Sequence, residues 1–169
     1  MVMSNKGTEI LCFSMDEQRF AISLDSVERV LRAQAVTAVP DSPEFICGVI
    51  DYHGEVIAVI NLRRRFNLQS RPIELNDRFI IAKTPSGKLA LIVDEVEGVL
   101  IPDEIDLYEA KQIFPEIDTG LKLVNILRED KGIILIYDME KFLSGKEEIK
   151  LQEINRTFFG MYINSKNSL

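Results

Sequence analysis

Residues 48–60 read Gly-Val-Ile-Asp-Tyr-His-Gly-Glu-Val-Ile-Ala-Val-Ile, and this stretch determines how the rest of the chain is interpreted. Two apolar runs rich in β-branched residues lie on either side of the dipeptide His53-Gly54. β-Branched residues favour strands, and glycine can adopt the positive φ that a tight hairpin turn requires. The stretch therefore predicts two antiparallel strands that are joined at His53-Gly54.

The same arrangement occurs three more times along the chain. Each time, two apolar runs enclose a short polar turn. Four hairpins with short turns favour closed antiparallel sheets over the parallel sheet of an α/β protein, so we predict a mainly β fold. The three further hairpins join residues 10–13 to 19–24, residues 79–83 to 88–93, and residues 123–127 to 133–137.

Few helices are expected. Asn61 and Asp138 each follow an apolar run, and both residue types favour the position just before a helix. Short helices are therefore predicted over 62–66 and 139–143. The last segment, 146–159, has apolar residues near helical spacing, so we predict a C-terminal helix that packs on the body of the protein.

The sequence also repeats itself twice, in the same order. The first repeat is an apolar strand followed by Asp, a Val-Glu pair and Val-Leu, and the second is an apolar strand that runs into a polar cap and a short helix. The first repeat indicates that Asp25 and Asp94 each turn the chain after a strand by binding nearby backbone N–H groups. The matching segments are 20–31 with 89–100 and 56–65 with 133–142.

These repeats predict two similar β sub-domains within one domain. The boundaries that we expect are about 9–75 and 76–145, inside a single domain 1–145 that is followed by a helical extension, 146–169. A chain of 169 residues suits one domain or two small sub-domains that share a core. This length also allows the chain to bury enough surface to fold without a disulfide or a metal.

The composition excludes several classes of protein. Asp and Glu number 27 against 20 Lys and Arg, which gives a net charge of −7, whereas nucleic-acid-binding domains usually carry a basic stripe. No apolar run approaches the length of about 20 residues that a membrane-spanning helix needs, and the first residues do not resemble a secretory signal. We therefore expect a cytoplasmic protein that binds no nucleic acid and does not insert into a membrane.

No catalytic or metal-binding pattern stands out. The one histidine, His53, cannot supply a histidine-based metal cluster, and the common nucleophile, phosphate-binding and dinucleotide-binding motifs are absent. Acidic groups at 94–97 and 103–106 are explained by turns and a solvated surface. Cys12 and Cys47 lie among apolar neighbours and are expected to be buried free thiols. We therefore expect no catalytic residue, no metal and no cofactor.

One basic run and one turn histidine remain as candidates for contact with a partner. Three consecutive residues of a short helix point in different directions, so the arginines of 63–65 cannot all face one partner. We expect solvated charge that is partly paired with acidic neighbours, and we name Arg63 as a candidate contact to an acidic protein surface. His53 is expected to be exposed at its hairpin tip, with partner contact as the functional alternative. A two-part β protein of this kind most often works by binding other proteins.

Several segments follow one another in an order that a known family shares. They are Phe20-Ala-Ile, Val27-Glu-Arg-Val30, Val36-Thr-Ala-Val-Pro40, Pro43-Glu-Phe-Ile46, Gly48-Val-Ile50, Gly54-Glu-Val-Ile57, Val59-Ile-Asn-Leu-Arg63, Ala90-Leu-Ile-Val-Asp94-Glu-Val-Glu-Gly-Val99 and Ile133-Ile-Leu-Ile-Tyr-Asp138. In this order they resemble the CheW family, the coupling proteins of bacterial and archaeal chemotaxis. The resemblance covers about residues 9–145, and the number and order of the segments make it specific.

This resemblance implies a fold of two intertwined five-stranded SH3-like β-barrels with short helices, around a shared hydrophobic interface. It implies a non-enzymatic adaptor that links the cytoplasmic tip of methyl-accepting chemoreceptors to a CheA-type histidine kinase. It also implies that the receptor binds in the groove between the sub-domains, at Val27, Arg29, Tyr52, His53 and Gly54.

The chain departs from the family's pattern at the hairpin tip. The family usually has Asn, an apolar residue, Arg and Gly there, whereas this chain has Asp51-Tyr52-His53-Gly54, so a histidine replaces the receptor-contacting arginine. In addition, Ala58 and Asn61 replace a usual Pro and Asp. Histidine can still donate hydrogen bonds, but its charge depends on pH. These differences indicate a divergent branch, suited to an alternative chemosensory pathway.

Two other functions are compatible with the sequence. One is a stand-alone CheW-like interaction domain that acts as a scaffold or an inhibitor and couples no receptor. The other is a small-molecule binder or an enzyme on a β-barrel scaffold, which would need a deep polar pocket with convergent titratable groups.

Overall fold

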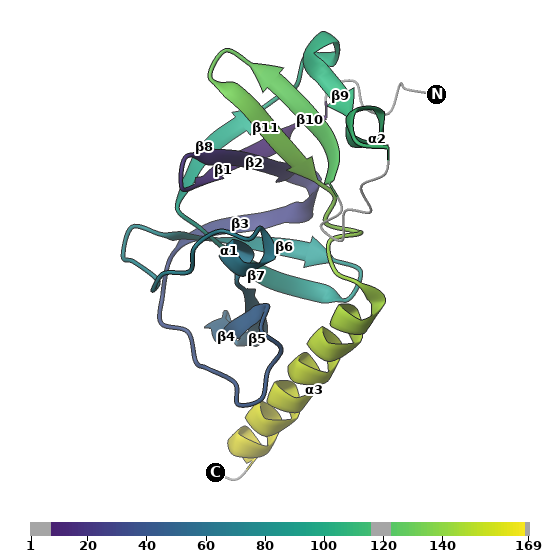
Figure 1. The fold of residues 1–169 in the computed structure, drawn as a ribbon. Coiled ribbons are helices and arrows are strands. Elements are labelled where there is room, and N and C mark those ends of the chain that lie inside the picture. The colour runs from purple at the N-terminus through teal and green to yellow at the C-terminus, as the bar shows by residue number, and fades with distance from the viewer. Residues whose placement is uncertain (1–7, 116–122, 168–169) are drawn as a thin grey trace.

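The computed structural model describes residues 8–115 and 123–167, and strands dominate it (Figure 1). One sheet has six strands in the order β8-β1-β2-β11-β10-β9, and the other has five in the order β3-β6-β7-β5-β4. The predicted mainly β fold is therefore confirmed. The first sheet consists of β1 (Ile10–Met15), β2 (Gln18–Ser23), β8 (Glu95–Leu100), β9 (Leu107–Glu109), β10 (Leu123–Glu129) and β11 (Gly132–Tyr137). The second consists of β3 (Val27–Arg32), β4 (Ile46–Tyr52), β5 (Glu55–Ile60), β6 (Arg78–Thr84) and β7 (Gly87–Val93).

All four predicted hairpins are present, as β1–β2, β4–β5, β6–β7 and β10–β11. In the turn of β4–β5, His53 and Gly54 both have positive φ, at 51° and 82°. Positive φ at both central residues is typical of the two-residue turn whose twist matches that of the strands. The carboxylate of Asp51 stabilises this turn, because its Oδ1 accepts the Gly54 N–H at 2.8 Å.

The chain crosses between the two sheets, so each sheet contains strands from both parts of the sequence (Figure 1). It passes from the six-stranded to the five-stranded sheet between β2 and β3, and it returns between β7 and β8. Parallel pairs then join early to late strands, β2 to β11 and β5 to β7. The expected boundary between 9–75 and 76–145 therefore does not separate the sheets, because these long-range pairs cross it. One sheet also has six strands rather than five, since the short β9 adds to β10.

A shared core lies between the sheets and receives side chains from both. Phe20 of β2 stacks on Phe66, with 4.7 Å between the ring centroids, and Phe66 stacks on Tyr137 of β11 at 4.8 Å. Ile80 and Leu89, from the other sheet, are fully buried in the same cluster. Aromatic stacks of this kind add to the stability that burial provides. The two sheets are therefore held together by one hydrophobic core.

The first short helix, α1 (Leu62–Arg65), begins where the sequence predicts. Asn61 caps it, because its Oδ1 accepts the Arg64 N–H at 3.3 Å. The remaining short elements are the helix α2 (Ala110–Ile113) and the 3₁₀ turns η2 (Leu24–Ser26) and η3 (Glu104–Asp106).

The predicted helix over 139–143 is wrong, because these residues form turns. Asp138 does bind the backbone, but its Oδ1 accepts the Glu140 N–H at 2.9 Å in a turn that no helix continues. The chain starts its helix six residues later instead, at a stronger signal. Ser144 Oγ accepts the Glu147 N–H at 3.2 Å, and Glu147 Oε1 accepts the Ser144 N–H at 2.9 Å, which is a reciprocal capping box.

The predicted C-terminal helix is present as α3 (Gly145–Asn167) and is longer than the expected 146–159. It packs against β5 and leads away from the sheets, with the C-terminus at its far end (Figure 1). Leu151 is completely buried in the shared core, and the half-buried Ile154 packs against that core. No helix of the described residues combines the length and the hydropathy that spanning a membrane requires.

Candidate interaction surface

Two segments that lie far apart in the sequence bring the predicted contact residues together. Val27 and Arg29 are in β3, whereas Tyr52, His53 and Gly54 are at the turn between β4 and β5. β3 and β4 are the two outer strands of the five-stranded sheet. Arg29 Nη1 nevertheless lies 3.1 Å from His53 Nε2, so these two edge strands approach each other at this point.

The chemistry of the Arg29–His53 contact fixes the state of the imidazole. A guanidinium can only donate hydrogen bonds, so His53 Nε2 must accept this one. When Nε2 accepts this bond, Nδ1 is the ring nitrogen that carries the proton. Both side chains belong to exposed residues. The surface thus presents donors, from Arg29 and from His53 Nδ1, to carboxylate or carbonyl oxygens of a partner.

Tyr52 anchors the hairpin beneath this surface. It is 7% exposed, and the ring of His53 rests edge-on against it with 4.6 Å between the centroids. Burial and a hydrogen bond to Glu28 raise the pKa of Tyr52. Lys88 Nζ lies 3.1 Å from carboxylate oxygens of both Glu28 and Glu55, so these charges connect β3, β7 and β5. These contacts hold the hairpin that carries His53 in place.

Val27 is less accessible than its neighbours on β3. It is half-buried and packs against the shared core, whereas Glu28, Arg29 and Val30 are exposed. Val27 therefore contributes to the fold as well as to the surface, and the accessible part of this strand is the segment that follows it.

Arg63, the remaining contact residue that was named from the sequence, lies inside the molecule rather than on its surface. It is 8% exposed, and its guanidinium binds Asp16 at 2.8 Å and Asp94 at 2.7 Å. Arg71 also binds Asp94 at 2.7 Å, and it binds Asp77, which is 2% exposed, at 2.7 and 2.8 Å. Five charged residues therefore connect the β1–β2 turn, α1 and the ends of the strands β6 and β7.

The three consecutive arginines point in different directions, as predicted from their helical spacing. Arg64 is half-exposed and lies 3.5 Å from Glu44. Arg65 forms an ion pair with Glu147 of α3, and its guanidinium lies 4.9 Å from the centroid of the Phe142 ring. This pair fastens the start of α3 to α1.

Contrary to the prediction from the sequence, Asp25 and Asp94 do not each turn the chain by binding nearby backbone N–H groups. Asp94 does accept a backbone N–H, at 2.9 Å, but this group belongs to Asp16 in a distant hairpin. At the other position, Ser23 rather than Asp25 caps the turn, because Ser23 Oγ accepts the Asp25 N–H at 3.3 Å. The chain does turn at both aspartates, but the partner of Asp94 is set by the tertiary structure.

Both cysteines are free within the described part of the chain. Cys12 is buried and Cys47 is half-buried, so the expectation of burial is met fully only at Cys12. Burial raises the pKa of each thiol to about 11. Residues 8–115 and 123–167 contain no group of three His, Cys, Asp or Glu side chains placed to hold a metal ion.

Known proteins are similar to this chain in sequence and in fold. Residues 9–147 match the CheW-like domain. The chain is 31% identical to a chemotaxis protein CheW of Thermotoga maritima, over 88% of this chain and 93% of that one, and 30% identical to one of Bacillus subtilis, over 81% and 87%. The crystal structure of the scaffolding protein TtCheW from Thermoanaerobacter tengcongensis superimposes with a TM-score of 0.72 at 30% identity, covering 83% of this chain and 97% of that one. Because the match spans most of its length, this chain belongs to the family of CheW-like domains.

Proposed function

We propose that this protein is a non-enzymatic adaptor of a chemosensory pathway, which links the cytoplasmic tip of chemoreceptors to a CheA-type histidine kinase. The observation that carries this proposal is the meeting of Arg29 and His53, at 3.1 Å, on one exposed surface. Both belong to the segments that resemble the receptor-binding segments of the family. We place the protein in the cytoplasm, beside membrane receptor arrays.

Coupling of this kind requires two docking surfaces and no covalent chemistry. The surface of Arg29 and His53 supplies hydrogen-bond donors for a receptor helix, and a separate face of the β-sheets would receive the β-domain of the kinase. Each contact can be weak alone, because an array holds many copies and raises the effective concentration of each partner. Affinity in the assembly therefore exceeds the affinity of either contact.

The arrangement of the reactive side chains does not favour an enzyme. Cys12 lies in the six-stranded sheet, whereas His53 is at the tip of a hairpin in the other sheet. Cys47 lies near the opposite end of β4 from His53. Nucleophilic catalysis by cysteine needs a base within hydrogen-bond reach, and His53 contacts neither thiol.

Titration of the protein with the cytoplasmic tip of its cognate receptor tests the proposal. Arg29→Ala and His53→Ala are expected to weaken binding by about ten-fold, as removal of a central polar contact often does. Arg32→Ala is the matched control, because it removes the same charge from the exposed far end of the same strand. Val27→Asp is a poorer variant, since Val27 packs on the core.

If Arg29→Ala and His53→Ala bind the receptor tip with the same affinity as the control Arg32→Ala, the receptor-binding role is overturned. A parallel titration with the regulatory domain of the kinase tests the second contact. Binding to neither partner would favour the stand-alone interaction domain.

A further inference from the structure

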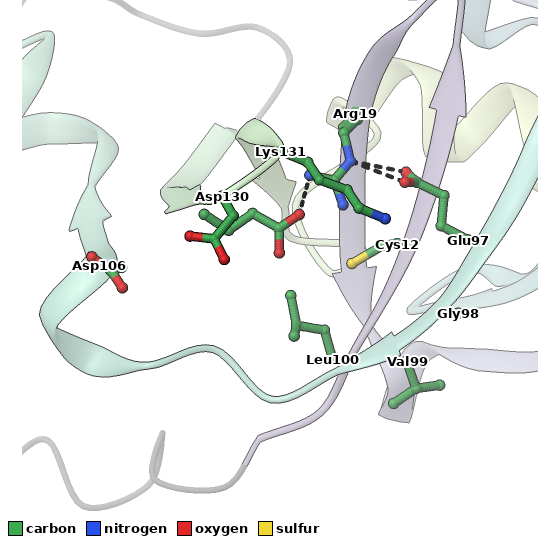
Figure 2. A pocket seen from close by; sticks show the side chains of 10 residues that line it. Cys12, Arg19, Glu97, Gly98, Val99, Leu100, Asp106, Asp130 and Lys131 are labelled. Atoms are coloured by element: carbon green, nitrogen blue, oxygen red, sulfur yellow. Dashed lines mark hydrogen bonds and ion pairs between the residues drawn. The ribbon is translucent and has the colours of Figure 1, made fainter.

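A pocket of about 420 Å³ lies beside the edge strand β8 of the six-stranded sheet (Figure 2). On one side is the edge strand β8, and on the other are the turn between β10 and β11 and Asp106 of η3. Among the described residues β8 pairs only with β1, so the backbone groups on its other edge form no strand pairing with this part of the chain. The lining residues from β8 are Glu97, Gly98, Val99 and Leu100.

A β-bulge turns one carboxylate of β8 into this pocket. Cys12 of β1 pairs with Gly98, but the next residue, Phe13, pairs with Val96, so Glu97 is the extra residue. Its Oε1 accepts from Arg19 Nε at 3.0 Å, and Arg19 also forms an ion pair with Glu129 (Figure 2). The charge of Arg19 is therefore already matched by two carboxylates.

The charges that line the pocket leave an acidic surplus. Four carboxylates line it, and Arg19 and Lys131 are the two cations. Asp106 is partly balanced by Arg128, whose Nη2 lies 3.2 Å away. Asp130 forms no ion pair with any residue in the described part of the chain. The carboxylate of Asp130 is thus available to a positive charge from outside.

The floor of the pocket is apolar. The thiol of Cys12, on a residue that is 3% exposed, faces the pocket (Figure 2). Burial raises the pKa of this thiol to about 11, so it stays neutral near pH 7. Leu100 lies beside it, and Val99 at the rim is 50% exposed. An acidic rim above an apolar floor fits a long basic side chain, whose stem is apolar and whose end is charged.

We propose that this pocket receives an arginine or lysine side chain from an extended segment of a partner protein, which pairs with the free edge of β8. Addition of a strand to a sheet edge uses backbone hydrogen bonds for affinity and a side-chain pocket for specificity. Gly98 leaves room for such an approach, because a Cβ atom there would meet no atom within 4 Å. Receptor coupling is proposed for the five-stranded sheet, so this pocket does not depend on it.

The test titrates ¹⁵N-labelled protein with the blocked pentapeptide Thr-Val-Arg-Val-Thr and follows the backbone amide signals. A peptide with citrulline in place of arginine keeps the shape and removes the charge, and a peptide with an N-methylated backbone cannot pair as a strand. The arginine peptide is expected to shift the amides of Gly98, Val99 and Lys131, and to bind about five-fold more tightly than the citrulline peptide. The N-methylated peptide is expected to lose this binding.

Asp130→Asn separates the pocket from general attraction by an acidic protein. It should weaken binding of the arginine peptide by about three-fold, as loss of one exposed ion pair does. Glu140→Gln removes the same charge from an exposed residue outside the pocket, and it should leave the affinity unchanged. Equal binding of the arginine and citrulline peptides, or shifts confined to residues away from β8, would overturn the proposal.

Discussion

The guanidinium of Arg29 and the imidazole of His53 meet across the two ends of the five-stranded sheet, with Nη1 and Nε2 3.1 Å apart. Each is the other's hydrogen-bond partner, and only the neutral imidazole with Nδ1 protonated can take part. The contact therefore requires one tautomer of the imidazole.

This tautomer can be observed directly. Long-range ¹⁵N–¹H spectra of the imidazole near neutral pH are expected to show Nε2 as the unprotonated nitrogen. In Arg29→Ala the donor is lost, so the preference between the two tautomers should relax. A protonated Nε2 in the unaltered protein would contradict the contact.

Replacement of Arg63 by Met should destabilise the protein. Asp16 would lose its guanidinium partner, and Asp94 would keep only Arg71. Loss of the cation from a partly buried group of carboxylates is costly. The expected fall in the midpoint of thermal unfolding is about 5 °C. Arg64→Met is the control, because Arg64 is half-exposed and its pair with Glu44 is long. Equal midpoints for the two variants would show that the internal ion pairs contribute nothing.

The protein should lose stability in acid because of Asp77 and Glu147. Burial alone would raise the pKa of each, but hydrogen bonds from Arg71 and Arg65 and from backbone N–H groups outweigh it, so both pKa values lie below the ordinary 3.8 and 4.5. Such groups stabilise the folded state above their unfolded pKa. That stabilisation is lost as the pH falls through the lower, folded pKa.

Urea unfolding at several pH values measures this effect. The free energy of unfolding is expected to fall from about pH 4.5 downward, and Asp77→Asn should make the fall shallower. Glu140→Gln, at an exposed position, should leave the slope as it is. A slope that Asp77→Asn does not change would refute the assignment.

The helix α3 should depend on one buried side chain for its attachment. Leu151 is completely buried in the shared core, so Leu151→Ala is expected to cost about 3 kcal/mol in the free energy of unfolding. Ile149, on the same helix, is 56% exposed, and Ile149→Ala should change that free energy by less than about 0.5 kcal/mol. Chemical denaturation of both variants measures the difference. Similar losses would mean that the helix does not pack through this face.

Local chemistry made the hairpins predictable. The apolar runs and polar turns identify four strand pairs, and Gly54 identifies a turn position with positive φ. The positive φ of His53 appears only in the structure. The crossing of strands between sheets was not readable in the same way, because it depends on the pairing of β2 with the distant β11. The repeat in the sequence therefore indicated two similar units, but it did not indicate that each sheet takes strands from both parts of the chain.

Polar and charged side chains were also predictable where their partners are close in sequence, and not where the partners are remote. Asn61 was recognised as a cap because its partner lies three residues away, at Arg64. Arg63 was expected at the surface because its partners, Asp16 and Asp94, are remote in sequence and meet it only in the folded protein. The capping box of Ser144 and Glu147 was readable from spacing alone. It is the signal that would have placed the start of α3 correctly.

The exchange of strands between the sheets has a consequence for biosynthesis. As the chain leaves the ribosome, β1 and β2 emerge first, yet their neighbours β8 and β11 are made much later. The outer edges of the β1–β2 hairpin therefore stay unpaired until nearly the whole domain has been translated. Contacts between such distant segments slow folding, so a chain interrupted near residue 75 would leave the ribosome with neither sheet complete.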